Sequence, residues 1–201
     1  MGLILKCSLV TFLLAGWATA HAADKFQLLA EPLRIPERGA VLSYAILTES
    51  NKFGFIPPVR WNVQADPPAK TVTLLSPDVT ASITLSFLPG EAAPAAEPDA
   101  ARVRREVLAR FPGARVTAEF RGYTTGTRCR TLDLKRVVNE QAVASRVAVV
   151  AYPHLTVQLN LTTSAERFAA YHQSLGQVMA SFRREALAPL PPANQAAGGN
   201  P

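Results

Sequence analysis

The amino-acid sequence predicts an α+β domain, an antiparallel β-sheet meander with helices packed on it. Two observations support this fold class. Several segments alternate apolar and polar residues with a period of two, and the connections between them have the length of hairpin turns. Two further segments carry apolar residues at helical spacing, and each follows a group of strands. Hairpins join antiparallel neighbours directly, whereas parallel strands need long crossovers.

The first group of strands is expected between residues 41 and 88. In its last member, Ile83, Leu85 and Phe87 alternate with serine and threonine, which is the pattern of an antiparallel strand with one buried face. Phe53 and Phe55 share one side of an earlier strand and are expected in the core. The expected strands are residues 41–48, 52–56, 71–75 and 80–88.

The first helix is expected from Pro98 to Phe111. Proline suits the first helical position because it has no N–H group to leave without a partner there. Pro112 and Gly113 then end the helix. One face of this helix is apolar, and it consists of Ala100, Val103, Val107 and Phe111.

Arg104 lies on the apolar side of this helix, where an unpaired charge is costly. One hypothesis is that it lies along the sheet and reaches a carboxylate or backbone carbonyls at an edge, with Asp133 as one candidate. The alternative is that the helix is rotated or frayed there, so that Arg104 reaches water. Under the first hypothesis, replacing it with methionine destabilises the domain by roughly 1–3 kcal/mol.

A second group of strands, residues 115–121, 127–138, 142–152 and 155–163, is joined by tight turns. The last helix is expected to begin at a capping box, in which the Thr163 hydroxyl and the Glu166 carboxylate satisfy backbone N–H groups reciprocally. It is expected to run to about Arg184 and to lay its apolar arc on the sheet. This arc consists of Phe168, Tyr171, Leu175, Val178, Met179 and Phe182.

The N-terminal residues have the composition of an export signal. Lys6 supplies a short basic region, residues 8–16 are apolar, and Ala20 and Ala22 place small residues before an expected cleavage after Ala22. The protein is therefore expected to be exported, either to the periplasm or by secretion. The expected organisation is a signal peptide at residues 1–22, an N-terminal extension at 23–40, a single domain at 41–188 and a disordered tail at 189–201.

Two internal segments lack periodicity. Residues 31–39 contain two prolines and a glycine, which indicates a linker or turn, although the segment before Val41 also allows an added edge strand. Residues 89–98 are rich in alanine and proline and are interpreted as a surface loop.

Composition argues against several classes of function. Loss of Lys6 with the signal leaves 20 basic and 15 acidic residues, a net charge of +5. No basic run of five residues and no aromatic stacking motif occurs, so nucleic acid is not an expected partner. No later apolar run reaches the roughly 18 residues of a membrane span. Cys129 is the one cysteine of the mature chain and is expected to be a half-buried strand residue.

No catalytic, cofactor-binding or metal-ligating residue is predicted. The motifs H-E-x-x-H, C-x-x-C and G-x-S-x-G are absent, and the mature chain keeps two histidines. His172 is expected to be a partly buried structural residue and His154 a solvated turn residue. We therefore expect a protein that is not an enzyme and that folds without a metal, a cofactor or a disulfide.

Several short motifs follow one another in a recognisable order. They are Phe53-Gly54-Phe55-Ile56-Pro57-Pro58 with Trp61, a Pro77-Asp78 turn into a Ser/Thr-rich strand, and the helix ends Arg110-Phe111-Pro112-Gly113-Ala114 and Ala180-Ser181-Phe182-Arg183. In this order the chain resembles the PsbP/DcrB-like superfamily over roughly residues 41–184. The resemblance implies an α/β/α sandwich and a protein that binds other proteins or assists complexes. It implies no functional residue, and fold alone does not fix function.

Four residues are candidates for contact with a partner. Arg128, Arg130 and Arg136 share one face of their strand with two leucines between them. This face is either a basic recognition strip or an end of the sheet where long side chains lie over apolar neighbours with their heads in water. Trp61, close to two prolines, either forms an exposed recognition ledge or packs under the sheet edge.

The leading hypothesis is an exported, non-enzymatic binding or assembly protein that contacts an unknown protein partner in the cell envelope. The alternative is a carrier of a small apolar ligand in a cavity between the sheet and a helix, and an enzyme is the third hypothesis. A cavity on the order of several hundred Å³ would favour the carrier. An exposed apolar or basic patch over a filled core would favour the protein binder.

Overall fold

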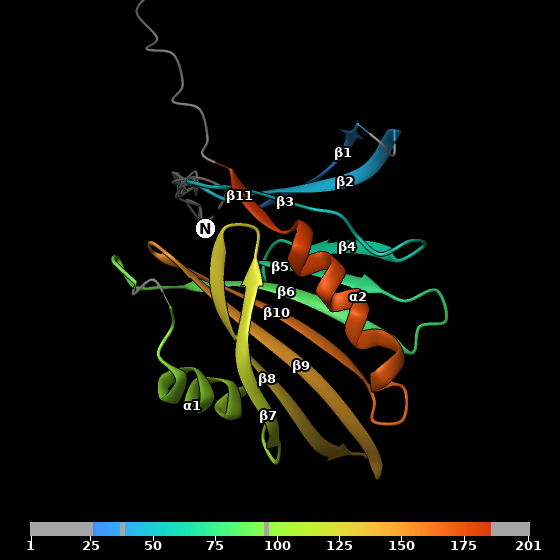
Figure 1. The fold of residues 1–201 in the computed structure, drawn as a ribbon, viewed down its shortest axis with the longest axis vertical. Helices are drawn as coiled ribbons and strands as arrows, with labels where there is room; N and C mark the ends of the chain where they lie inside the picture. Colours follow the sequence, from blue (N-terminus) through green and yellow to red (C-terminus); the bar gives the residue numbers. More distant parts are fainter. Residues whose placement is uncertain (1–25, 37–38, 95–96, 186–201) are drawn as a thin grey trace, which may run out of the picture.

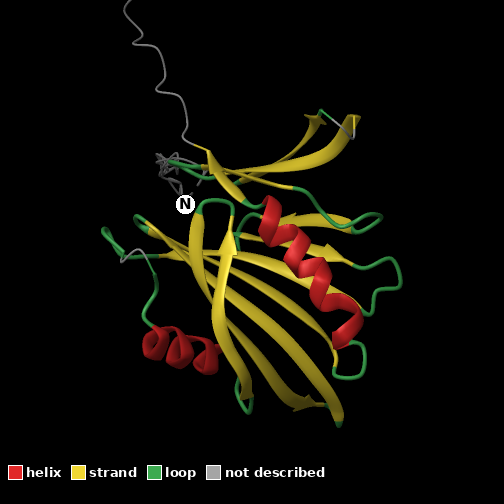
Figure 2. Ribbon diagram, viewed as in Figure 1, coloured by secondary structure: helices red, strands yellow, loops and turns green. Residues whose placement is uncertain are grey.

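The computed structural model describes residues 26–36, 39–94 and 97–185, which form two antiparallel sheets and two helices (Figure 1). Figure 2 shows both helices on the outside of the sheets. The predicted fold class, antiparallel sheet with helices packed on it, is confirmed. Neither helix of the described part has the length and apolar character that a membrane span needs. The expected signal peptide, residues 1–22, and tail, residues 189–201, lie outside the described residues.

The larger sheet has the strand order β4-β5-β6-β10-β9-β8-β7, and all neighbours are antiparallel. The strands β7 to β10 are the predicted meander, and β10 then pairs with β6, which joins the two halves of the chain. The strands are β4 Asn62–Asp66, β5 Thr71–Leu75, β6 Ala81–Pro89, β7 Arg115–Thr124, β8 Thr127–Val138, β9 Gln141–Tyr152 and β10 Leu155–Ser164.

The smaller sheet has the strand order β1-β2-β3-β11. Its strands are β1 Gln27–Ile35, β2 Gly39–Leu47, β3 Lys52–Phe55 and β11 Arg183–Glu185. The interpretation of the segment before Val41 as an edge strand is confirmed, because β1 pairs with β2 along its whole length. The linker interpretation is wrong for residues 31–35, which belong to β1.

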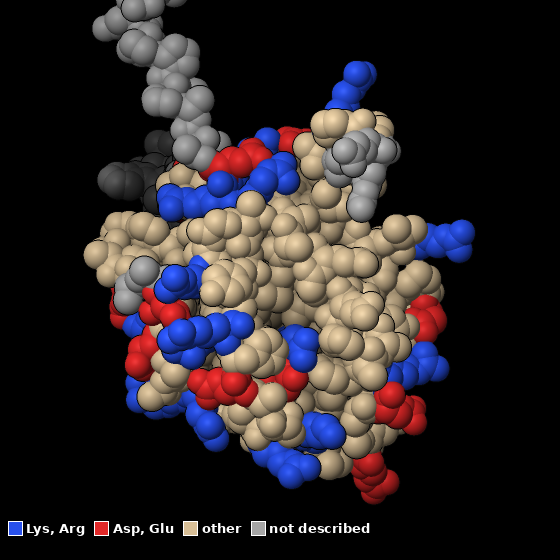
Figure 3. Space-filling model, viewed as in Figure 1, with Lys and Arg blue, Asp and Glu red and all other residues tan. Residues whose placement is uncertain are grey.

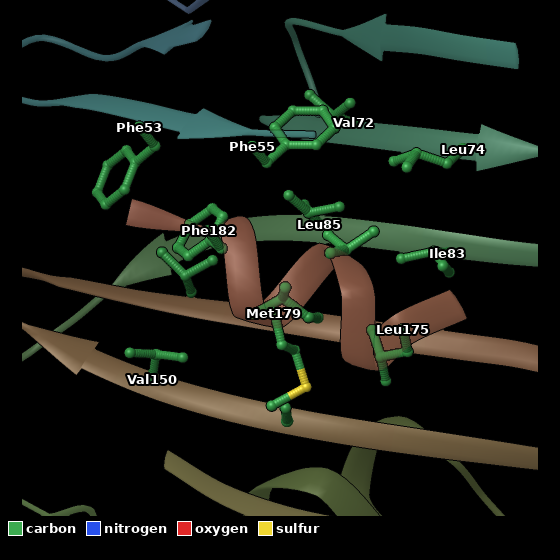
Figure 4. Packing of buried hydrophobic residues seen from close by; sticks show 14 of the residues in the cluster. Phe53, Phe55, Val72, Leu74, Ile83, Leu85, Val150, Leu175, Met179 and Phe182 are labelled. Atoms are coloured by element: carbon green, nitrogen blue, oxygen red, sulfur yellow. The ribbon is translucent and has the colours of Figure 1, made fainter. Parts of the chain in front are cut away.

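The main core lies between the two sheets and α2 (Phe168–Ser181). Phe53 and Phe55 of β3 are fully buried there, as predicted, together with Leu175 and Phe182. Figure 4 shows the side chains of Leu175, Met179 and Phe182 directed at the strand residues of this cluster. The space between α2 and the sheet is therefore filled by side chains.

A second, smaller core lies under α1 (Ala100–Arg110). Val103 and Val107 pack there on Leu132 and Leu134 of β8. Cys129, at an odd position of β8, belongs to the main core instead. Because successive residues of a strand point to opposite faces, α1 and α2 cover opposite faces of the larger sheet.

Both predicted ends of the last helix are wrong. Thr163 is part of β10, and its hydroxyl donates to the backbone carbonyl of Thr80 at 2.9 Å, so no capping box forms. The helix begins at Phe168 without a side-chain cap and ends at Ser181. Arg184 lies in β11, opposite Phe53, since the chain becomes extended to cover the edge of β3.

The start of α1 also differs from the prediction. Asp99 is the N-cap, and its carboxylate accepts a hydrogen bond from the backbone N–H of Arg102 at 2.7 Å. Aspartate satisfies the free N–H groups of a first turn directly, so Pro98 precedes the cap instead of opening the helix. The strand β4 was not predicted; Val63 and Ala65 alternate with polar residues there, but the strand is only five residues long and mostly exposed.

Candidate functional site

The four candidate contact residues do not come together in one site. Arg128, Arg130 and Arg136 alternate with Leu132 on β8, so they share the face that packs against α1. Trp61 lies on the other side of the larger sheet, against the main core and α2. The four residues predicted from the sequence therefore belong to two separate surfaces.

The arginines of β8 largely contact the chain itself. Arg130 pairs with Glu97 at 2.8 Å, between Nη2 and Oε1. The guanidinium of Arg136 lies over the ring of Phe111, 5.2 Å from its centroid. Arg128 is exposed and has no ion pair within the described part of the chain. This arrangement matches long side chains laid over their neighbours, and a role in partner binding stays a prediction.

Trp61 is half-buried immediately before β4. Its backbone N–H donates to the carbonyl of Pro58 at 3.2 Å, which closes a turn in which Arg60 has a left-handed φ of 66°. The indole meets the ring of Tyr171 in α2 edge to face, with centroids 5.9 Å apart. One side of Trp61 is thus packed on α2, and another side lines an open groove.

This groove, which we call the α2 groove, has a volume of about 890 Å³. Its walls come from β2, from the segment between β3 and β4, and from the C-terminal half of α2. Leu42 and Val59 are its most exposed apolar side chains, with exposed fractions of 55% and 85%. The lining residues are Val41, Leu42, Tyr44, Ile56, Pro57, Pro58, Val59, Arg60, Trp61, Gln177, Ala180 and Ser181.

Charge is sparse around the α2 groove. None of the 14 residues of α2 is lysine, arginine, aspartate or glutamate, and Arg60 is the one charged residue among the described residues that line the groove. Figure 3 shows a mainly uncharged surface over α2, with charged side chains around it and a group of both signs below and to the left of it. The exposed residues of α2 are Ala169, Ala170, Gln173, Gly176, Gln177 and Ala180.

The groove walls are fixed to the core. The backbone N–H of Ile56 donates to the Ser181 hydroxyl oxygen at 2.9 Å, which joins the end of β3 to the end of α2. Tyr44 of β2 stacks on the buried ring of Phe55, with centroids 5.8 Å apart. The groove is therefore a preformed feature and does not depend on a mobile wall.

The N-terminal part of α2 is held by Asp78, in the turn between β5 and β6. Its carboxylate accepts hydrogen bonds from the hydroxyls of Ser76 at 2.7 Å, Thr80 at 2.8 Å and Tyr171 at 2.9 Å. Arg167 adds an ion pair at 2.8 Å. The Ser76 hydroxyl, followed by those of Thr80 and Tyr171, holds the pKa of Asp78 well below its usual range.

Arg104 is half-exposed and lies 3.7 Å from a carboxylate oxygen of Glu119. The predicted pairing with Asp133 is wrong, because Asp133 points to the face opposite α1 and accepts two bonds from Arg146, at 2.7 and 2.8 Å. The broader hypothesis, that Arg104 reaches a carboxylate at an edge of the sheet, describes this contact with Glu119 of the edge strand β7. The side chain of Arg104 has an exposed fraction of 53%, so it also reaches water, as the alternative hypothesis expects.

The structure also places the other titratable residues that the sequence singled out. Cys129 is fully buried, not half-buried, and desolvation raises the pKa of its thiol. His154 is exposed in a turn, and His172 is half-buried and stacks on Phe168. Within the described ranges, no group of three or more histidine, cysteine, aspartate or glutamate residues is placed to hold a metal ion.

Sequence reasoning found Trp61 with the adjacent Pro57 and Pro58 but missed the rest of the α2 groove. The apolar run of residues 41–48 predicts Leu42 in a buried strand, yet it is largely exposed. Val59 belongs to no predicted strand or helix, so no sequence pattern indicated its place in the groove. A usable signal was the absence of charge across residues 168–181, which is unusual for a helix with one face in water.

No family model matches the chain, and no curated protein sequence matches it. Solved structures do. Cyanobacterial PsbP (CyanoP) of Synechocystis sp. PCC 6803 is 13% identical, with a TM-score of 0.49, over 85% of this chain and 98% of CyanoP. LpqN of Mycobacterium tuberculosis, described as involved in cell envelope biogenesis, is 16% identical, with a TM-score of 0.49, over 78% of this chain and 91% of LpqN.

A protein of Bacteroides thetaiotaomicron is 17% identical, with a TM-score of 0.46, over 68% of this chain. The match spans 46% of that protein, so this chain corresponds to less than half of its length. A PsbP protein is among the solved structures that the chain resembles.

Proposed function

We propose that this protein is exported and acts as a non-enzymatic binding protein, with the α2 groove as its contact surface for another protein of the cell envelope. The observation that carries the proposal is the pairing of exposed apolar side chains, Leu42 and Val59, with the uncharged outer face of α2. The export part rests on the signal-like residues 1–22.

The physical reason is the low cost of removing water from this surface. The cores of protein interfaces are depleted in charged residues and enriched in aromatic ones. Trp61 and Tyr44 supply aromatic area in the groove, and Leu42 and Val59 supply apolar area that water now covers. Fully burying one such aliphatic side chain contributes roughly 1.5–3 kcal/mol, so a partner that covers both gains a useful part of its binding free energy.

The arrangement supports a protein partner over a small apolar ligand. A carrier holds its ligand in a cavity that encloses most of the ligand. Here the space between α2 and the sheet is occupied by fully buried side chains such as Phe55, Leu175 and Phe182. The α2 groove lies outside that filled core, at the surface.

The proposal is tested by capture of partners from the envelope fraction of the source cells with the tagged full chain. The test variants are Val59→Asp and Ala180→Glu, which place a charge on two different walls of the groove. The matched control is Val137→Asp, since Val137 is 72% exposed on β8, away from the groove. A protein that is retained by the control, lost by both groove variants and bound again as a purified component supports the proposal. Capture that both groove variants leave unchanged contradicts it.

A further inference from the structure

Three hydrogen-bonding side chains in the α2 groove have no partner among the described residues. They are the indole N–H of Trp61, the hydroxyl of Tyr44 and the amide of Gln177. The two rings are nevertheless held in place, Trp61 by Tyr171 and Tyr44 by Phe55. The groove thus presents fixed aromatic surfaces with unused polar ends, and the indole can act only as a donor.

A ligand complements such a surface when it has apolar area and free hydrogen-bond acceptors. A chain segment in the polyproline II conformation has no internal hydrogen bonds, so its carbonyl groups remain available. Each proline in it also lacks an N–H group, so the segment brings few donors that would need an acceptor from the groove. Rings of tryptophan and tyrosine bind such segments because they offer flat apolar area and a donor at the edge.

The charge of the groove further limits the class of ligand that fits it. The groove holds a single charged side chain, that of the exposed Arg60, among its described lining residues. A strongly charged segment would lose hydration there without gaining enough opposite charge to offset it. The walls themselves include Pro57, Pro58 and Val59, which add rigid apolar contacts. An uncharged segment complements this surface.

We infer that the α2 groove binds an extended, uncharged, proline-rich segment of the partner protein, whose carbonyl groups accept hydrogen bonds from Trp61 and Tyr44. The inference rests on the function proposed above and specifies which part of the partner the groove recognises. A preformed groove and a ligand that is already extended both lose little conformational entropy on binding.

The test uses the full chain with Trp17→Phe, so that Trp61 is the one tryptophan left to report by fluorescence. The probe is a synthetic peptide, Ala-Pro-Leu-Pro-Pro-Ala, which has the sequence of residues 188–193 of the chain itself, and the control peptide carries alanine in place of each proline. We expect a saturable change in Trp61 emission with the proline peptide alone. Val59→Asp should weaken its binding by about tenfold or more, and Val137→Asp should leave it unchanged. No saturable change, equal binding of both peptides, or an unaffected Val59→Asp variant overturns the inference.

Trp61 emission also tests two other possible occupants of the α2 groove, a segment of the chain itself and a second copy of the protein. Residues 186–201 contain Pro189, Pro191 and Pro192. If replacing these three prolines by alanine changes Trp61 emission without peptide, the segment of the chain itself occupies the groove and the inference of a partner segment is overturned. Emission that changes on dilution without peptide assigns the groove to a second copy and also overturns it.

The inference and the proposed function can fail separately. If the envelope partner is lost with Val59→Asp and Ala180→Glu while the proline peptide does not bind, the groove binds a protein but recognises another kind of segment. If capture is unaffected by either groove variant, the proposed function itself fails.

Discussion

The two helices cover opposite faces of one sheet and differ sharply in charge. Five of the 11 residues of α1 are arginine or glutamate, whereas the 14 residues of α2 include no lysine, arginine, aspartate or glutamate. Both bury an apolar stripe, Val103 and Val107 in α1, and Leu175, Val178 and Met179 in α2. The difference is therefore confined to the surfaces that face outward.

The two helices differ in the charge of the surface that each presents to its surroundings. The charged residues of α1 form ion pairs, Arg102–Glu106 within the helix at 3.9 Å and Arg104–Glu119 to strand β7 at 3.7 Å. Such exposed pairs add little stability but keep a surface hydrated. The outer side of α2 has no charge to hydrate, so covering it with another molecule costs less. The comparison supports the proposed contact surface on the α2 side.

The largest effect is expected inside α2. Leu175→Ala should lower the free energy of unfolding by about 2–5 kcal/mol, because it removes a fully buried side chain and leaves a cavity. The exposed neighbour Gln173→Ala should change it by less than about 0.5 kcal/mol. Urea denaturation of both variants measures the difference. Similar losses for the two would mean that the buried face of α2 is assigned incorrectly.

A smaller, pH-dependent effect is expected at the anchor of α2. The pKa of Asp78 is lowered, chiefly by the Ser76 hydroxyl, so the folded state binds the proton less tightly than the unfolded state does. The stabilisation by the Asp78 carboxylate is therefore complete above its ordinary pKa of about 3.9 and is lost as the pH falls toward the lower folded value. Asp78→Asn removes this contribution.

The urea midpoints of the wild type and Asp78→Asn should differ by the same amount at about pH 7 and pH 5, and by less at about pH 2.5. Asp66→Asn is the matched control, since Asp66 is an exposed aspartate on β4. A difference that stays constant down to the lowest pH, or that grows, would show that the hydrogen bonds to Asp78 do not depend on its charge.

The smallest effect is expected on the outer side of α1. Arg104→Met should change the free energy of unfolding by less than about 0.5 kcal/mol, because the side chain is largely exposed and its ion pair with Glu119 is long. Thermal or urea denaturation beside Glu119→Gln checks this. A loss of stability near 2 kcal/mol would mean that α1 depends on the Arg104–Glu119 contact, as α2 depends on its contacts with Asp78.

The sequence predicted the meander because each of its strands carries its own alternation of apolar and polar residues. In β10, Leu155, Val157, Leu159 and Leu161 indicate the buried face without any knowledge of the neighbours. The two main helices were predicted for the same reason, since their apolar stripes are local. Elements that bury one regular face are readable from sequence.

The errors arose where distant contacts override a local pattern. Thr163 and Glu166 have the spacing of a capping box, but Thr163 pairs with Ala81 and Ala144 in the sheet, and those ladders take precedence. The three residues of β11 carry no apolar pattern, because β3 alone fixes their conformation. The α2 groove was missed for a related reason, since its walls come from three separate segments.

The pairing of β3 with β11 has a consequence for the order in which the fold forms during synthesis. Arg184 donates to Asn51, 133 positions earlier in the chain. A chain that emerges N-terminus first must therefore leave one edge of β3 open until Arg183–Glu185 have emerged. Such a long-range pairing forms late and slowly. The small sheet consequently cannot close before residues 183–185 have been synthesised, a delay that would suit the proposed export of an unfolded chain.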